Sequence, residues 1–186
     1  LFRACRFLGQ LDFMADSSLV EGMKSAFPRV SGLSLERVRD EVDKLIVTSH
    51  AARGFDLMVR TGLADCSCRA KEKGIFTDIP ILPELSHLVG LPQQKEFHKY
   101  DGWYHTLAVL EASKPVLVNR WAAFLHDVGK GMPGIRAVRK GKLTDYGHDT
   151  KGAEMARGIL TRWKRPTPFT DRVVWLVENH MKFHYF

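Results

Sequence analysis

Apolar residues recur every three or four positions along most of this chain, and this period limits the folds that it can adopt. One such stripe covers residues 35–46 and follows Ser34, a residue type that caps helices. No run of alternating apolar and polar residues is long enough to support a sheet. The sequence therefore predicts an all-α fold, with helices near 17–27, 35–46, 49–61, 82–89, 101–113, 116–128, 148–164 and 168–183.

Two segments lack the helical period. Residues 65–80 have no regular pattern and are expected to form a loop. Residues 129–147 are rich in glycine and in basic side chains, and this is the place where we expect a short hairpin.

Composition narrows the class of protein. Of 186 residues, 45% are hydrophobic and 26% are charged, which is typical of a globular protein. No apolar stretch approaches the roughly eighteen residues that cross a bilayer, and the start of the chain lacks a signal-peptide layout, so we expect a cytoplasmic protein without a membrane partner. The three cysteines fit neither a disulfide framework nor a zinc knuckle. Because the chain starts at Leu1 inside a helical pattern, we expect it to belong to a longer protein.

Positive charge is concentrated in the last half of the chain. The net charge is +7, and residues 101–186 hold fourteen Lys and Arg against eight Asp and Glu. Such an excess favours a polyanionic partner or a phosphorylated substrate, although a solvated basic loop would also produce it. The candidate nucleic-acid-binding residues form two groups, which are Arg136, Arg139, Lys140 and Lys142, and Arg162, Lys164 and Arg165.

Four histidines lie at inner or terminal positions of four separate predicted helices. They are His105, His126, His148 and His180, and His126 is followed directly by Asp127. A buried carboxylate beside an imidazole is costly unless a cation neutralises it, and a divalent metal ion does so directly. Imidazole and carboxylate ligands suit Mn, Fe, Ni or Zn better than Ca.

Each candidate also has an ordinary explanation. A single histidine on a helix is more often a core or boundary residue than a ligand, and we apply that explanation to His50, His87, His98 and His184. Lys130, just after the His-Asp pair, could bind a phosphate as a point charge or could be an exposed lysine in a mobile loop. The ordered combination of histidines is much rarer than its parts.

This ordered set resembles the HD superfamily of metal-dependent phosphohydrolases, which are helical domains. The resemblance implies that His105, His126 and Asp127 bind a divalent ion (Mn, Ni, Fe, Zn or Mg). The catalytic candidates are Asp127, as a proton acceptor, and Lys130, as a cation for the phosphate. The resemblance further implies that His148 and His180 serve a second metal or the substrate phosphate. The family pattern closes with an Asp on a later helix, and no residue after His180 matches it.

The first part of the chain is similar to another family. LFRACRFLGQLDF and SLERVRDE resemble the neck of class II CCA-adding enzymes and bacterial poly(A) polymerases. The blocks ILPELSHLVGLPQ, YDGWYHTLAVL, FLHDVGKGMP and YGHDTKGAEM resemble the members with an attached HD domain. The resemblance implies neck and body helices at 1–64, a connecting segment at 65–97 and an HD domain at 98–186. The nucleotidyltransferase site of that family would precede this chain.

Two functions follow from these resemblances. In the first, the HD domain hydrolyses phosphomonoesters or 2′,3′-cyclic phosphates at tRNA or RNA 3′ ends with the help of a divalent metal ion. In the second, the chain is a non-catalytic module that holds tRNA by its backbone and supports a nucleotidyltransferase head. The joint presence of His105, His126 and Asp127 favours the first function.

Overall fold

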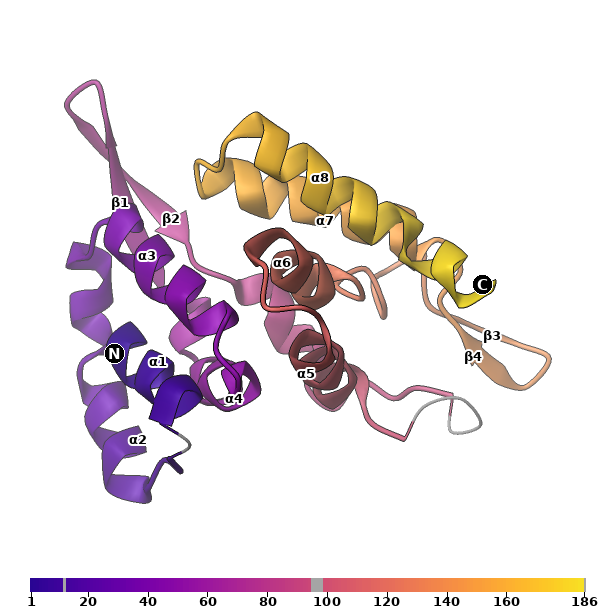
Figure 1. Cartoon of the computed structure of the whole chain (residues 1–186), viewed down its shortest axis with the longest axis horizontal. Helices are drawn as coiled ribbons and strands as arrows, with labels where there is room; N and C mark the ends of the chain where they lie inside the picture. Colours follow the sequence, from indigo (N-terminus) through magenta and orange to yellow (C-terminus); the bar gives the residue numbers. More distant parts are fainter. Residues whose placement is uncertain (12, 95–98, 186) are drawn as a thin grey trace. The chain divides into compact units, whose positions relative to one another are not determined.

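The computed structural model describes residues 1–11, 13–94 and 99–185 (Figure 1). Within these ranges the fold is mostly helical, as predicted, with two short β-hairpins in addition. The chain divides into two compact units, Leu1–Ser86 and His87–Phe186. That division lies inside the predicted connecting segment 65–97, whose boundary between residues 97 and 98 is outside the described residues. None of the described helices is long and apolar enough to cross a membrane.

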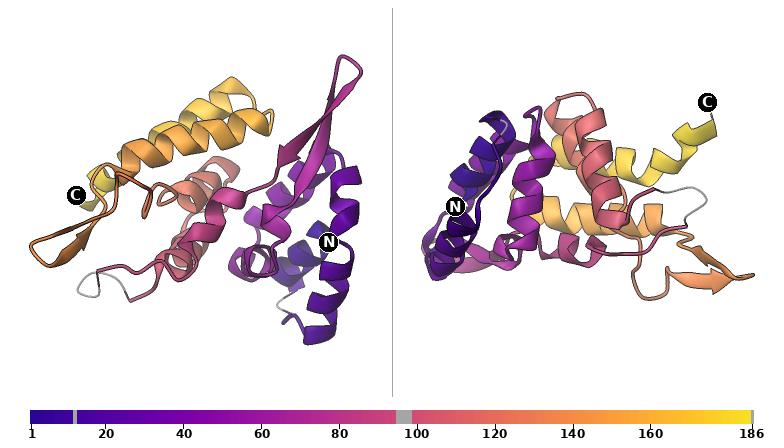
Figure 2. Two further views of the ribbon diagram at one scale, coloured as in Figure 1. Left: turned by 180° about the vertical axis from the view of Figure 1, so that it is seen from behind. Right: turned by 90° about the horizontal axis from the view of Figure 1, so that it is seen from below.

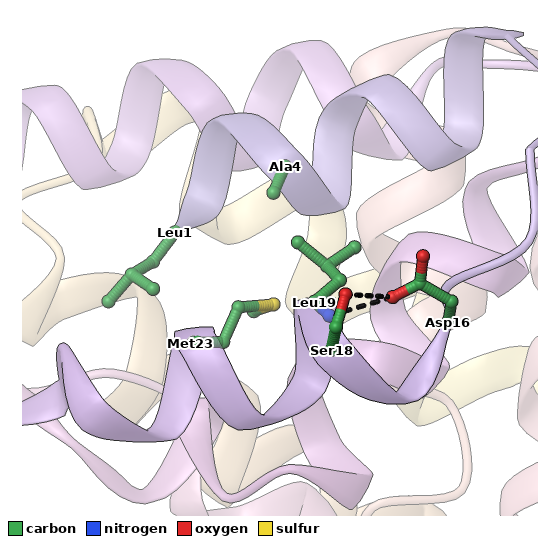
Figure 3. Close-up of a pocket in the computed structure, with 7 residues that line it drawn as sticks. Leu1, Ala4, Asp16, Ser18, Leu19 and Met23 are labelled. Carbon is green, nitrogen blue, oxygen red and sulfur yellow. Dashed lines mark hydrogen bonds between the residues drawn. The ribbon is translucent and has the colours of Figure 1, made fainter.

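The described residues of the first unit form four α-helices and two short 3-10 turns. They are α1 (Phe2–Leu11), α2 (Ser17–Ser25), η1 (Phe27–Gly32), α3 (Leu35–Ile46), α4 (Ala51–Arg60) and η2 (Leu63–Asp65). Helix α1 packs against α3 and α4. The cap expected at Ser34 is confirmed, since its side chain accepts from the backbone of Arg37. Asp16 caps α2 and accepts from Ser18 and from the backbone of Leu19. An open pocket of about 420 Å³ lies beside the Asp16 cap (Figure 3), lined by Leu1, Ala4, Asp16, Ser18, Leu19, Gly22 and Met23.

The prediction of a loop at residues 65–80 is wrong. The structure has an antiparallel hairpin here, formed by β1 (Ser67–Glu72) and β2 (Ile75–Pro80). Only Cys68 and Ala70 are buried within β1, so the alternating pattern is too short to stand out in the sequence. The turn residues Lys73 and Gly74 both have positive φ angles, 48° and 85°, as in the tight turns that favour hairpins. A Lys-Gly pair between two β-compatible segments was therefore the available signal.

The described residues of the second unit form four α-helices. They are α5 (Gly102–Ala112), α6 (Leu117–Leu125), α7 (His148–Arg162) and α8 (Thr167–Asn179), followed by the 3-10 turn η4 (His180–Tyr185); the turn η3 (Pro83–Leu88) contains the boundary between the units. Helices α7 and α8 lie side by side, and α8 also packs against α6 (Figure 2). Trp103, Trp121, Trp163 and Phe124 form the centre of this core. The hairpin expected within 129–147 is confirmed as β3 (Ala137–Arg139) and β4 (Lys142–Thr144).

Candidate metal centre

The five predicted metal ligands come from the ends and one face of four helices. His105 lies in the second turn of α5, and His126 follows the last residue of α6, with Asp127 next to it. His148 is the first residue of α7, and His180 follows the last residue of α8. The structure therefore brings all five residues into one region of the second unit.

Gly129 allows helix α7 to approach the turn that follows α6. A Cβ atom at this position would collide with the backbone carbonyl of His148 and with the backbone of Gly152 on α7. Only glycine avoids such a collision without moving the helix. The residue two positions after Asp127 thus permits α7 to lie directly against the turn that carries the His-Asp pair.

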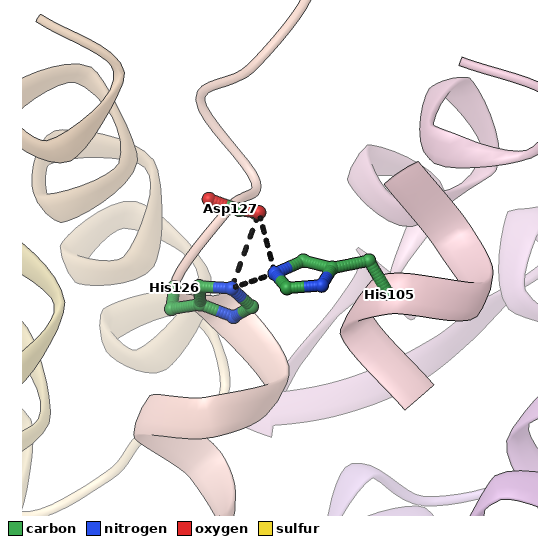
Figure 4. Close-up of side chains that lie close together, drawn as sticks. All are labelled: His105, His126 and Asp127. Atoms are coloured by element: carbon green, nitrogen blue, oxygen red, sulfur yellow. Dashed lines mark hydrogen bonds and ion pairs between the residues drawn. The ribbon is translucent and has the colours of Figure 1, made fainter. Parts of the chain in front are cut away.

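Asp127 is at the centre of the cluster. Its Oδ2 atom lies 3.1 Å from Nε2 of His126 and 3.4 Å from Nε2 of His105 (Figure 4). Its Oδ1 atom lies 3.3 Å from Nε2 of His148 and 3.6 Å from Nε2 of His180. Each carboxylate oxygen therefore faces a different pair of imidazoles. The cluster contains two groups of three possible ligands, with Asp127 as the member that they share.

The backbone fixes the orientation of three of the rings. Nδ1 of His126 lies 2.7 Å from the carbonyl of Ala123, and Nδ1 of His180 lies 2.6 Å from the carbonyl of Val177. His148 makes the corresponding contact with the carbonyl of Asp145 at 2.7 Å. Because a carbonyl can only accept, each Nδ1 atom carries a proton and donates it. In the neutral rings the Nε2 atoms then present lone pairs toward Asp127.

These lone pairs make a cation the natural partner of the cluster. The Nε2 atoms of His105 and His126 are 3.3 Å apart, and those of His148 and His180 are 3.1 Å apart. Neither oxygen of Asp127 accepts a hydrogen bond of acceptable geometry from a described residue. The lone pairs of these nitrogens and oxygens repel one another unless a proton or a bound cation lies between them. A set of imidazole nitrogens with one carboxylate fits a divalent transition metal.

The carboxylate of Asp127 is ionised in this environment. Its side chain is 1% exposed, and burial by itself raises the pKa. The electrostatic effect of the neighbouring His126 and the contacts with His126, His148 and His180 outweigh burial and hold the pKa of Asp127 well below its usual value. A buried negative charge is thus available for a metal ion.

Lys130 is part of this site and is not a mobile surface lysine. Its Nζ atom lies 2.8 Å from Oδ2 of Asp127 and donates to Oε1 of Gln93 at 3.0 Å. Its backbone carbonyl lies 2.9 Å from Nε2 of His87. The residue is only 8% exposed. Gln93 and His87 were not predicted as site residues, and no charge or periodicity in the sequence indicates their role.

His50 is the N-cap residue of α4 and makes no side-chain cap hydrogen bond. It is not a member of the His-Asp cluster. His98 and the side chain of His184 lie outside the described part of the chain. The ordinary explanation given for these histidines therefore stays a prediction for His98 and His184.

The structure separates the basic residues into different environments. Arg136 forms a two-point ion pair with Asp145, with distances of 3.0 and 2.8 Å, so its charge is used inside the domain. Asp145 also accepts from the backbone N–H of Gly131. In contrast, the β3–β4 hairpin exposes Arg139, Lys140 and Lys142. The guanidinium of Arg139 lies 5.2 Å from the ring of Tyr146, which is 68% exposed.

The second basic group lies far from the metal cluster. Arg162 ends α7, about 21 Å along that helix from His148 at a rise of about 1.5 Å per residue. Arg165 packs its guanidinium between the rings of Trp121 and Phe169, at 5.3 and 5.1 Å. Arg165 therefore contributes to the packing of the domain. Contact of Arg162, Lys164 and Arg165 with nucleic acid stays a prediction.

Two family models match separate parts of the chain. The model described as "Probable RNA and SrmB- binding site of polymerase A" matches residues 12–66, and the model of the HD domain matches residues 102–185. These matches define the class: an RNA-binding segment of the polymerase A type, followed by an HD domain that contains the His-Asp cluster.

Curated proteins extend this assignment to the whole chain. The A-adding tRNA nucleotidyltransferase of Deinococcus radiodurans is 33% identical over 97% of this chain and 40% of its own length. The multifunctional CCA protein of Azoarcus sp. is 31% identical over 97% of this chain and 41% of its own length. The CC-adding tRNA nucleotidyltransferase of Thermus thermophilus is 36% identical over 78% of this chain and 31% of its own length.

The chain thus spans between 31% and 41% of the length of these relatives. It belongs to the family of CCA-adding enzymes and poly(A) polymerases and carries an HD domain. The resemblance seen in the neck and HD motifs is confirmed.

Proposed function

We propose that the second unit is a metal-dependent phosphohydrolase that acts on phosphomonoesters or 2′,3′-cyclic phosphates at RNA ends. The observation that carries the proposal is the arrangement of ring nitrogens around Asp127. Three rings direct Nε2 toward one ionised, buried carboxylate because their Nδ1 atoms are committed to backbone carbonyls. Such an array of acceptors supports metal binding, and a site of nitrogen and oxygen ligands suits Mn, Fe, Ni or Zn.

The residues of the cluster have distinct roles in this proposal. His105, His126 and Asp127 would hold one divalent ion, and His148 and His180 with Asp127 would hold a second ion or the substrate phosphate. A divalent ion, when bound, lowers the pKa of a water molecule and offsets phosphate charge.

Lys130 would bind the phosphate as a point charge. Its ammonium already lies next to Asp127, so a phosphate held at the cluster comes within reach of this cation. Gln93 accepts a hydrogen bond from the same ammonium and helps to keep it in place. Asp127 can also accept a proton when it is not fully engaged as a ligand.

The first unit and the basic β3–β4 hairpin support RNA as the molecule that carries the phosphoester. The curated relatives are named as tRNA nucleotidyltransferases, and residues 12–66 match an RNA-binding model. Exposed Arg139, Lys140 and Lys142 would contact the RNA backbone near the start of α7. Arg139→Ala should therefore weaken tRNA binding and leave hydrolysis of a small phosphoester unchanged.

The test combines metal content with hydrolysis. Asp127→Asn keeps the size of the side chain and removes its charge, and it should lose bound metal and more than about 100-fold of the activity on a 2′,3′-cyclic nucleotide. The matched control is Asp171→Asn, which removes an exposed surface pair with Arg157. Metal content of Asp127→Asn equal to that of the native chain would reject the ligand assignment.

The match of residues 12–66 to an RNA-binding model favours a second function for the first unit, which is to hold tRNA for the nucleotidyltransferase reaction of the family. In that case the HD residues could be structural. A native chain that binds metal and tRNA but hydrolyses neither cyclic phosphates nor phosphomonoesters would support this alternative.

A further inference from the structure

A small cleft in the first unit lies where the β1–β2 hairpin meets the start of α3. It has a volume of about 330 Å³ and is lined by Gly32, Ser34, Glu36, Arg37, Arg69, Lys71 and Phe76. The backbone N–H of Arg69 donates to the carbonyl of Leu33 at 2.9 Å and so ties the hairpin to the residue before the α3 cap. The walls of the cleft are therefore fixed to one another within this unit.

The cleft contains more positive than negative charge. The lining contains the cations Arg37, Arg69 and Lys71 and one carboxylate, Glu36. Asp78 is the cross-strand partner of Arg69 in the hairpin. Among the residues that the structure describes, neither carboxylate forms an ion pair with any of these three cations. Three cations that share one cleft without such a pair repel one another, and a bound anion would relieve that repulsion.

An exposed aromatic ring, that of Phe76, forms part of the cleft lining. The ring of Phe76 is 55% exposed, and the guanidinium of Arg69 lies 4.6 Å from its centroid. Lys71 is the cross-strand partner of Phe76, and its ammonium lies 5.3 Å from the same centroid. Phe76 does not contribute to the core, because Cys68 and Ala70 on the other face of the hairpin are the residues that are buried. Nucleic-acid bases stack on exposed aromatic rings and on guanidinium planes of this kind.

We propose that this cleft binds single-stranded RNA, with a backbone phosphate between Arg37, Arg69 and Lys71 and the adjacent base stacked on Phe76 and Arg69. Unpaired cations beside an exposed ring are the combination that single-stranded nucleic acid requires. An acidic peptide would use the cations but not the ring. The site extends past residues 12–66 into the hairpin, and it does not depend on hydrolysis at the HD domain.

The experiment measures binding of a short fluorescent single-stranded RNA to the full chain by anisotropy over a range of salt concentrations. Phe76→Ala should weaken binding about tenfold, as expected for one lost stacked base, with an unchanged salt slope. Phe76→Tyr should restore most of the affinity. Arg69→Ala and Lys71→Ala should each flatten the salt slope by about 0.7, the value for one phosphate contact on a single strand.

The control is Lys24→Ala, which removes an exposed cation of α2 outside the cleft and should change affinity less than about twofold. Circular dichroism checks that each variant is folded, and the exposed positions make folding defects unexpected. Native affinity in Phe76→Ala would overturn the proposal, as would a Lys24→Ala effect as large as that of Arg69→Ala. Competition by polyglutamate as effective as that by unlabelled RNA would instead assign the cleft to acidic peptides.

Discussion

Replacing Asp127 with Asn tests the charge balance of the HD unit, since this residue contacts Lys130 at 2.8 Å and is 1% exposed. Removing one partner of a buried ion pair costs about 3 to 5 kcal/mol because the other charge stays buried without compensation. Gln93 continues to accept from Lys130, so we expect the free energy of unfolding to fall by about 3 kcal/mol, the lower end of that range. For a unit of this size, about 4 °C per kcal/mol converts the loss to a fall of about 12 °C in Tm.

Calorimetry with and without added metal measures both effects of the substitution. A metal ion at about 100 times its dissociation constant stabilises the native chain by about 2.7 kcal/mol, or about 11 °C in the Tm of the HD unit. Asp127→Asn should show less than about 2 °C of that rise, whereas the control Asp171→Asn should show all of it. An equal rise in Asp127→Asn would refute the assignment of Asp127 as a shared ligand.

Three further predictions concern the surroundings of the cluster. Lys130→Ala should reduce hydrolysis of a small phosphoester by at least about tenfold with unchanged metal content, as measured by single-turnover kinetics and elemental analysis. The partner Arg136 holds the pKa of Asp145 below its usual value although burial raises it. The stabilisation of the fold by ionised Asp145 is present above the unfolded pKa of about 3.9 and is lost as the pH falls through the folded pKa. Arg136→Ala should thus lower the free energy of unfolding by about 2 kcal/mol at pH 7 in urea titrations, and this difference should shrink in acid. Gly129→Ala should destabilise the unit by about 1 to 3 kcal/mol because of the collision with α7, whereas Gly158→Ala, with open space around it, should be neutral or stabilising.

Sequence periodicity was sufficient for most helices because they bury an apolar stripe, as α3 does. Helix α2 buries only Met23, and the helix predicted near 82–89 is the 3-10 turn η3. Periodicity failed for the β1–β2 hairpin, where two buried side chains, Cys68 and Ala70, cannot establish an alternating pattern. Burial of these two residues depends on contact of β1 with α3 and η1, which no local pattern encodes. The contact of Gln93 with Lys130 likewise joins residues 37 positions apart.

The metal candidates were predictable because residue chemistry and local backbone geometry agree there. At the ends of α6 and α8, the last backbone carbonyls lack an α-helical N–H donor. His126 and His180 occupy these ends, and each donates from Nδ1 to the carbonyl three residues earlier. The same bond that completes the helix end also turns Nε2 outward, past the end of the helix and toward Asp127. A histidine directly after an apolar helix is therefore a better ligand candidate than one within a helix, because the cap itself orients its free nitrogen. His105, which lies within α5, lacks this local determinant, and its place in the cluster follows from the packing of α5 against α6.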